Sequence, residues 1–185
     1  MKVLAILGSR NPEGQTAQAV NALLSGVEAE GGAVERLFLP EKDIQRCRQC
    51  TASGWGTCRQ EGMCIIHDDL AGIAAAIRAA EAVVFATPVY FGDLSESMRA
   101  FLDRLRRVSR PSGANFAGKK AVGICVAGGG GGGAPSAVVS LEKILVTCGF
   151  DVVDLIPARR QNLDHKKVVL EITGRWLAGL CRAGQ

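Results

Sequence analysis

The chain has 185 residues, of which 48% are hydrophobic and 22% are charged, with a formal net charge of +4. This composition excludes a disordered chain, and so mild a charge gives no support for a nucleic-acid partner. The apolar runs are far shorter than the roughly 20 residues that span a membrane. We therefore expect one cytoplasmic domain over residues 1–185, whose cysteines stay reduced or bind a metal.

The chain alternates between strand-like and helix-like segments. Continuous apolar runs predict five strands covered on both faces: Lys2–Leu7, Val34–Leu39, Ala82–Thr87, Lys120–Val126 and Val152–Pro157. Helical spacing of apolar residues predicts Thr16–Glu30, Asp68–Ala80 (with Asp68 as its N-cap), Ser95–Val108, Pro135–Cys148 and Asp164–Arg182. This alternation predicts an α/β three-layer sandwich around a five-stranded parallel sheet, in the flavodoxin-like order 2-1-3-4-5.

The segment "GSRNPEGQT", Gly8 to Thr16, follows the first predicted strand. It lacks the lysine of a nucleotide-triphosphate loop and the glycine spacing of a dinucleotide fingerprint. Its hydroxyls, amides and helix-start N–H groups suit one compact phosphate dianion. The alternative is an ordinary polar turn.

Two more loops follow strands three and four. One is "TPVYFGDLS", Thr87 to Ser95, and the other is the six-glycine run from Gly128 to Gly133. Open parallel sheets bind ligands beyond the carboxyl ends of their strands, so the three loops are expected to meet. A flat ring could then rest on Tyr90, Phe91 and the glycines. The alternatives are core packing for the aromatic pair and a flexible connector for the glycines.

Residues 46–66 fit no strand or helix and form a cysteine-rich loop insertion. The segment "CRQCTASGWGTCRQEGMC" has the spacing C-x2-C-x7-C-x5-C. Four thiolates this close can hold an iron–sulfur cluster or a tetrahedral zinc ion. Free, disulfide-forming or redox-sensing thiols are the other interpretation. The cysteines concerned are Cys47, Cys50, Cys58 and Cys64, whereas Cys125, Cys148 and Cys181 are expected in the core.

Four arginines lie near the end of the helix predicted over Ser95–Val108. We expect this group to be a solvated helix end, with a grip on the phosphates of NADPH as the alternative. The four are Arg104, Arg106, Arg107 and Arg110.

The first loop and the segment "TPVYFGDLSESMRAFLDR" resemble the flavin-phosphate and isoalloxazine loops of the flavodoxin-like NAD(P)H-dependent FMN reductases, and most closely their iron–sulfur flavoprotein branch. The resemblance implies non-covalent FMN. It places Ser9, Arg10, Asn11, Gly14, Gln15 and Thr16 around the phosphate. It places Pro88, Val89, Tyr90, Phe91 and Gly92 on one edge of the ring, and Gly128, Gly129, Gly130 and Gly133 on the other side.

The sequence departs from that branch at two places. Gln15 stands where the family commonly has asparagine, and Ser53 stands where its third cysteine usually lies. The second departure leaves open whether the four cysteines bind a [4Fe-4S] cluster, zinc or nothing.

The function expected from the resemblance is an FMN-dependent NAD(P)H oxidoreductase that passes electrons to a quinone, a flavin or another small acceptor. No catalytic side chain is expected, because the flavin carries the chemistry. One alternative is an electron carrier that uses a cluster on the four cysteines and exchanges electrons with a redox protein. Another is a non-enzymatic redox or metal sensor. A homodimer or homotetramer is expected, with no membrane or nucleic-acid partner.

Overall fold

The computed structural model describes residues 1–111 and 115–183. Five parallel strands form the sheet, in the order β2-β1-β3-β5-β6. Strand β1 pairs with β2 on one side and with β3 on the other, so that Val3 lies opposite both Val34 and Ala82. The strands are β1 (Lys2–Leu7), β2 (Ala33–Phe38), β3 (Ala82–Tyr90), β5 (Lys120–Ala127) and β6 (Asp151–Arg159).

The five predicted strands and their spatial order are confirmed. The sheet also carries a short sixth strand, β4 (Asp93–Leu94), which pairs antiparallel with the end of β3. The stretch expected as a loop after Thr87 is therefore partly a hairpin, because β3 continues to Tyr90.

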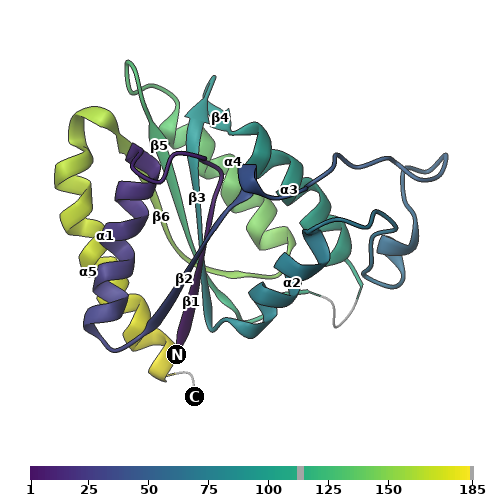
Figure 1. Ribbon diagram of the computed structural model, residues 1–185, viewed down its shortest axis with the longest axis horizontal. Helices are drawn as coiled ribbons and strands as arrows, with labels where there is room; N and C mark the ends of the chain where they lie inside the picture. The colour runs from purple at the N-terminus through teal and green to yellow at the C-terminus, as the bar shows by residue number, and fades with distance from the viewer. Residues whose placement is uncertain (112–114, 184–185) are drawn as a thin grey trace.

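Helices cover both faces of the sheet (Figure 1). On one face lie α1 (Gln15–Ala29) and α5 (Leu163–Ala183), and on the other lie α2 (Leu70–Ala79), α3 (Glu96–Val108) and α4 (Ala134–Thr147). Alternate side chains of each strand enter the two cores. Val3 and Ala5 of β1 pack with α1 and α5, whereas Leu4 and Ile6 pack with the other three helices. The three-layer architecture is thus the predicted one.

Helices α1 and α5 lie unusually close because each contributes a glycine to their contact. A Cβ built on Gly174 would lie 2.0 Å from the carbonyl oxygen of Leu23, and one built on Gly26 would lie 2.0 Å from that of Glu171. Only hydrogen fits at these positions, so the backbones of the two helices touch.

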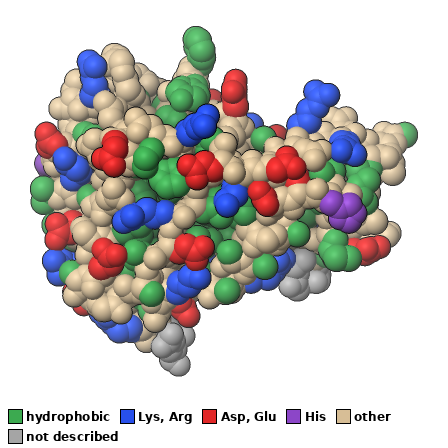
Figure 2. All heavy atoms as spheres, in the orientation of Figure 1, with side chains coloured by type: hydrophobic (Ala, Val, Ile, Leu, Met, Phe, Trp, Pro, Cys, Tyr) green, Lys and Arg blue, Asp and Glu red, His purple; other side chains and the backbone are tan. Residues whose placement is uncertain are grey.

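No charge of one sign dominates the face of the molecule seen in Figure 2. Figure 2 shows acidic and basic side chains interspersed over the visible face, in keeping with a net charge of only +4. Among the described residues, no helix is long and apolar enough to cross a bilayer.

The cysteine-rich segment leaves the sheet after β2 and returns at α2, and it projects from the side of the molecule in Figure 1. Its regular structure is limited to a 3-10 turn at Thr57–Arg59. The segment between β2 and α2 thus lies to one side of the α/β frame.

The α1–α5 contact gives a stability prediction. Replacing Gly174 by alanine should lower the free energy of unfolding by about 1–3 kcal/mol or more, since a methyl group must displace backbone. Gly179 lies on the same helix with nothing within 4 Å of its Cβ position. Its replacement by alanine should leave stability unchanged or raise it by up to about 1 kcal/mol. Urea unfolding of both variants measures the difference, and equal effects would contradict the described packing.

Candidate functional site

A pocket of about 530 Å³ opens beyond the carboxyl ends of β1, β3 and β5, and we call it the loop pocket. Three chain segments that are distant in sequence meet there, as the order of the strands requires. The residues that line it are Ser9, Asn11, Gly14, Gln15, Thr16, Pro88, Val89, Tyr90, Val126, Ala127, Gly128, Gly129 and Gly132.

The first segment ends in the N-terminus of α1. Asn11 organises the turn, because its side chain accepts a hydrogen bond from the N–H of Glu13 (3.0 Å) and its carbonyl accepts one from Gly14 (3.1 Å). In the described part of the chain, the N–H groups of Ser9, Gln15 and Thr16 have no acceptor. A helix N-terminus with free N–H groups and no acidic residue in its first turn attracts an anion.

The second segment is the end of β3 and its hairpin. Pro88, Val89 and Tyr90 line the loop pocket, and the Tyr90 side chain is 56% exposed. Phe91 forms the tip of the hairpin with a left-handed φ of 51° and a fully exposed ring. Gly92 faces Gly133, whose Cβ position lies 2.4 Å from the Gly92 Cα. An apolar wall with one polar aromatic group is typical of a ligand site.

The third segment is the glycine run after β5. It is held by a turn in which Gly131 donates to the carbonyl of Gly128 (2.8 Å), and by Gln161, whose Nε2 donates to the carbonyl of Gly129 (3.1 Å). Gly129, Gly131 and Gly133 have positive φ, a conformation that other residues rarely adopt. The run is therefore a defined loop that presents bare backbone to the pocket.

The structure brings together ten of the residues expected around a flavin: Ser9, Asn11, Gly14, Gln15, Thr16, Pro88, Val89, Tyr90, Gly128 and Gly129. Five others lie outside the pocket lining, namely Arg10, Phe91, Gly92, Gly130 and Gly133. Gly133 instead forms the N-cap of α4, and Phe91 points into solvent. Sequence reasoning missed Val126, Ala127 and Gly132. The first two were recoverable, because they end the strand that enters the glycine run.

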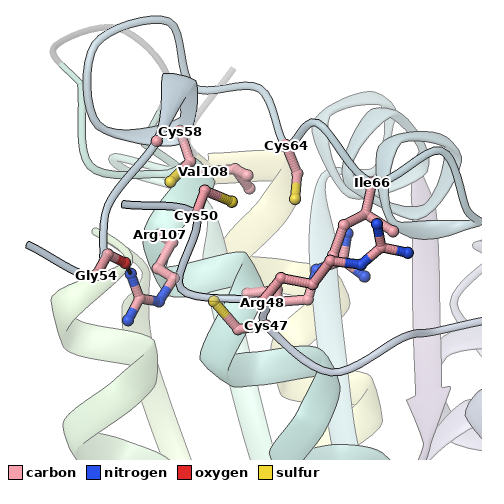
Figure 3. Close-up of a pocket in the computed structure, with 11 residues that line it drawn as sticks. Cys47, Arg48, Cys50, Gly54, Cys58, Cys64, Ile66, Arg107 and Val108 are labelled. Carbon is pink, nitrogen blue, oxygen red and sulfur yellow. Dashed lines mark hydrogen bonds between the residues drawn. The ribbon is translucent and has the colours of Figure 1, made fainter. Parts of the chain in front are cut away.

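A second cavity lies beside α3, and we call it the cysteine cavity (Figure 3). Its lining includes all four clustered cysteines, Cys47, Cys50, Cys58 and Cys64, together with Arg104 and Arg107. The space between these groups is about 10 Å³, which is the size of one water molecule. Within residues 1–111 and 115–183, no three His, Cys, Asp or Glu side chains are gathered to hold a single metal ion. The four thiols thus surround one space without forming a preassembled zinc site.

Arginine–aromatic contacts hold the outer part of the cysteine-rich segment. The Arg107 guanidinium lies 4.7 Å from the centre of the Trp55 ring and donates to the carbonyl of Gly54 (2.8 Å). Arg59 lies 5.8 Å from the same ring centre. Thr51 donates to the carbonyl of Trp55 (2.7 Å). Trp55 therefore anchors the loop to α3 by cation–π contact and hydrogen bonding.

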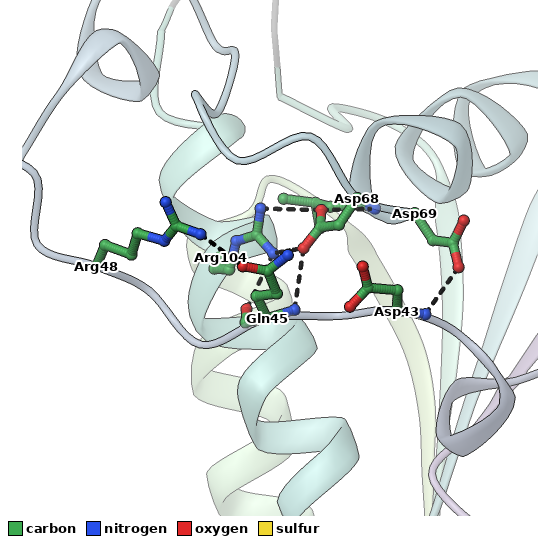
Figure 4. Close-up of polar contacts among 7 residues, drawn as sticks. Asp43, Gln45, Arg48, Asp68, Asp69 and Arg104 are labelled. Atoms are coloured by element: carbon green, nitrogen blue, oxygen red, sulfur yellow. Dashed lines mark hydrogen bonds and ion pairs between the residues drawn. The ribbon is translucent and has the colours of Figure 1, made fainter.

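A buried ion pair fixes the inner part of that segment (Figure 4). Arg104 of α3 pairs with Asp68 through both terminal guanidinium nitrogens, Nη1 and Nη2, and its Nη1 also donates to the carbonyl of Gln45 (2.9 Å). Both side chains are essentially inaccessible to solvent. Burial raises the pKa of Asp68, but hydrogen bonds from Arg104 and from the N–H groups of Gln45 and Leu70 outweigh it, so the pKa lies below its ordinary value.

Two expectations are corrected here. Arg104 is not part of a solvated helix end, because it is buried against Asp68, and Arg107 is committed to Trp55. Asp68 is not the N-cap residue of α2, because the helix begins at Leu70 with Asp69 at the N-cap position, but the Asp68 side chain accepts a hydrogen bond from the N–H of Leu70 (3.3 Å). Periodicity could not separate the buried Arg104 from the half-buried Arg106 and Arg107 and the exposed Arg110, since the partner of Arg104 lies 36 residues away.

The remaining cysteines are core residues, as predicted. Cys125, Cys148 and Cys181 are buried. Burial raises the pKa of Cys125 to about 12 and that of Cys148 to about 11. Thiols with such values stay protonated and unreactive near neutral pH.

A parallel sheet in this order, with a loop pocket at its switch point, defines a flavodoxin-like α/β protein. Comparison with protein families assigns the chain further. It belongs to the NADPH-dependent FMN reductase family, whose model matches residues 1–169.

Curated relatives include two proteins named iron–sulfur flavoprotein. The one from Methanocaldococcus jannaschii is 35% identical over 129 residues, which are 70% of this chain and 62% of that protein. The one from Methanosarcina thermophila is 30% identical over 129 residues, which are 70% of this chain and 63% of that protein. The chain thus matches less than two thirds of the length of either relative.

Solved structures share the fold at low sequence identity. An archaeal flavodoxin superposes with a TM-score of 0.64 at 15% identity, covering 98% of this chain and 99% of the other. The NAD(P)H:quinone oxidoreductase from Methanothermobacter marburgensis superposes with a TM-score of 0.68 at 21% identity, covering 96% of each chain.

The buried ion pair gives a prediction about stability and pH. Replacing Asp68 by asparagine should lower the free energy of unfolding by about 3–5 kcal/mol at pH 7, because Arg104 then keeps a buried charge without its partner. In the unmodified protein the contribution of Asp68 is present above its unfolded pKa of about 3.9 and is lost as the pH falls through its lower folded pKa. Denaturant unfolding between pH 7 and pH 3 measures both effects. A D68N variant with undiminished stability at pH 7 would contradict the pairing.

Proposed function

We propose that the chain binds FMN in the loop pocket and acts as an NAD(P)H-dependent oxidoreductase with a quinone, a free flavin or another small molecule as acceptor. The observation that carries the proposal is the convergence of three loops on one pocket with a row of free N–H groups at its base. Membership of the NADPH-dependent FMN reductase family supports it.

The residues present fit a flavin mononucleotide. The free N–H groups of Ser9, Gln15 and Thr16 and the positive end of the α1 dipole would hold the phosphate dianion without a metal. Pro88, Val89 and Tyr90 would contact the ring on one side. Gly128 and Gly129 would allow the ring to approach bare backbone on the other side.

The bound flavin supplies the hydride and electron chemistry. The chain's own part is to bind and orient it. The apolar wall of Pro88 and Val89 excludes water from one side of the pocket, and the half-exposed Tyr90 leaves a route for a second flat molecule. NAD(P)H and the acceptor would therefore bind in turn against the same exposed surface.

Flavin binding can be tested with a matched pair of neighbouring aromatic residues. The purified protein should bind FMN and oxidise NAD(P)H in the presence of a quinone. Tyr90→Ala should weaken FMN binding about tenfold, the order of magnitude for loss of one aromatic contact to a flat base. Phe91→Ala should have little effect, because its ring lies outside the pocket lining. Flavin fluorescence titration measures both, and a protein that binds no FMN would refute the proposal.

A second candidate function rests on the cysteine cavity. We propose that Cys47, Cys50, Cys58 and Cys64 hold a [4Fe-4S] cluster, which would supply one-electron transfer. The donor set fits in kind and number, since four thiols line one space. The buried Nε of Arg104, which has no hydrogen-bond partner among the described residues, offers a donor to sulfur. A space of about 10 Å³ requires the segment to open when a cluster enters, and Gly54 and Gly62, both at positive φ, are positions where it can bend.

Chemical analysis tests this second function. Protein prepared without air should contain iron and acid-labile sulfide, and Cys50→Ser should abolish most of both. Cys181→Ala, at a buried cysteine of α5, is the control and should retain them. If iron and sulfide are absent after anaerobic reconstitution, the cysteines do not hold a cluster. This conclusion is independent of the result for FMN.

A further inference from the structure

Two hydroxyl groups at the start of α3 donate hydrogen bonds to one backbone carbonyl, at the point where the loop proposed to bind phosphate begins. Ser95 is the N-cap of α3, and its Oγ donates to the carbonyl of Gly8 at 2.9 Å. Ser97, in the first turn of the helix, donates to the same carbonyl at 3.1 Å. The N–H of Gly8 donates to the carbonyl of Ala86 at 2.8 Å, which ties this residue to β3 as well. We call these two serines and the Gly8 carbonyl the hydroxyl clamp.

Within the hydroxyl clamp, Ser95 and Gly8 are buried and Ser97 is half-buried, and Thr87 supports Ser95 by hydrogen bonding. Thr87 accepts a hydrogen bond from the N–H of Ser95 (3.0 Å), and the two hydroxyls lie 3.0 Å apart. Ser95 is 2% exposed and Thr87 is inaccessible to solvent. The contact also depends on a glycine, because a Cβ on Gly8 would lie 2.5 Å from the Ser95 Oγ. The Gly8 backbone and the Ser95 hydroxyl are therefore held in one arrangement.

This arrangement determines where the next N–H points. A trans peptide bond is planar and places its C=O and N–H on opposite sides. The carbonyl of Gly8 is directed at α3, so the N–H of the same peptide, which belongs to Ser9, is directed away from α3. Helix α1 lies on the opposite face of the sheet from α3 (Figure 1). The Ser9 N–H thus points to the side where Gln15 and Thr16 present their own free N–H groups.

We propose that Ser95 and Ser97 are positioning residues for the phosphate of the flavin: by holding the Gly8 carbonyl, they aim the Ser9 N–H into the loop pocket. This inference rests on the proposed binding of FMN. It differs from that proposal in assigning a role to side chains that do not line the pocket and that bind the carbonyl edge of the peptide, opposite its N–H.

The prediction separates positioning from general stability by comparing two ligands. FMN and riboflavin share the ring and the ribityl chain and differ in the phosphate. Loss of the hydroxyl clamp should weaken FMN binding and leave riboflavin binding unchanged. A merely structural defect would weaken both ligands alike, since both need the same ring pocket.

The experiment uses the full chain with the single substitutions Ser97→Ala and Ser95→Ala. Each should raise the dissociation constant of FMN about tenfold, as expected for misalignment of one N–H bonded to a charged group. Ser109→Ala is the control: its buried hydroxyl donates to the Arg106 carbonyl at the other end of α3. Isothermal titration with FMN and with riboflavin gives both constants for each variant.

Ser97 is the informative position if the loss of the N-cap at Ser95 unfolds the protein, because Ser97 does not cap the helix. An S97A variant with an unchanged ratio of FMN to riboflavin affinity would overturn the inference. Equal loss of both affinities would overturn it too. If the unmodified protein binds neither ligand, the proposed function itself fails. If it binds both equally, the phosphate contributes nothing and the inference fails while ring binding stands.

Discussion

The buried ion pair between Arg104 and Asp68 fixes the relation between the α/β frame and the cysteine-rich segment. A charge in a protein core is tolerated only when it is paired and hydrogen-bonded. Arg104 meets that condition by bonding to both ends of the segment. It donates to the carbonyl of Gln45 at one end and to the carboxylate of Asp68 at the other. The position of the four thiols over α3 follows from that constraint, with Arg107 and Trp55 completing the attachment.

Helix α3 thereby serves both candidate sites. Ser95 at its N-cap and Ser97 in its first turn hold the Gly8 carbonyl, where the loop proposed to bind phosphate begins, and its residues 104 and 107 line the cysteine cavity. Ser95 and Arg104 are nine residues apart, a separation of about 14 Å along a helix. One rigid element of this length links the two proposed redox sites, so a change in the packing of α3 would be felt at both.

The arrangement of the sheet could be predicted from the sequence because it depends on local patterns of apolar residues. Apolar runs located the five strands, and the rule that ligands bind at the carboxyl ends of parallel strands predicted that three loops meet in one place. The family resemblance named the individual residues, ten of which line the pocket. The hairpin at Asp93–Leu94 escaped because a two-residue strand carries no periodicity. The burial of Arg104 and the exposure of Phe91 were not predicted for a different reason. Tertiary packing gives Arg104 a buried partner and leaves Phe91 without one among the described residues. Residue type alone suggested the opposite for both.

Two reciprocal hydrogen bonds join the two ends of the cysteine-rich segment. The N–H of Asp43 donates to the carboxylate of Asp69 (2.8 Å), and the N–H of Asp69 donates back to the carbonyl of Asp43 (3.0 Å). The excursion therefore departs and re-enters at a single point, so a change in its length costs the frame little beyond a modest closure entropy. Its contents do touch the frame, because Cys58 lies in the core beside α3 and Trp55 packs against that core. Such a junction makes the thiol-bearing stretch exchangeable on a flavodoxin-like scaffold, provided that the replacement also covers the part of α3 around Arg107.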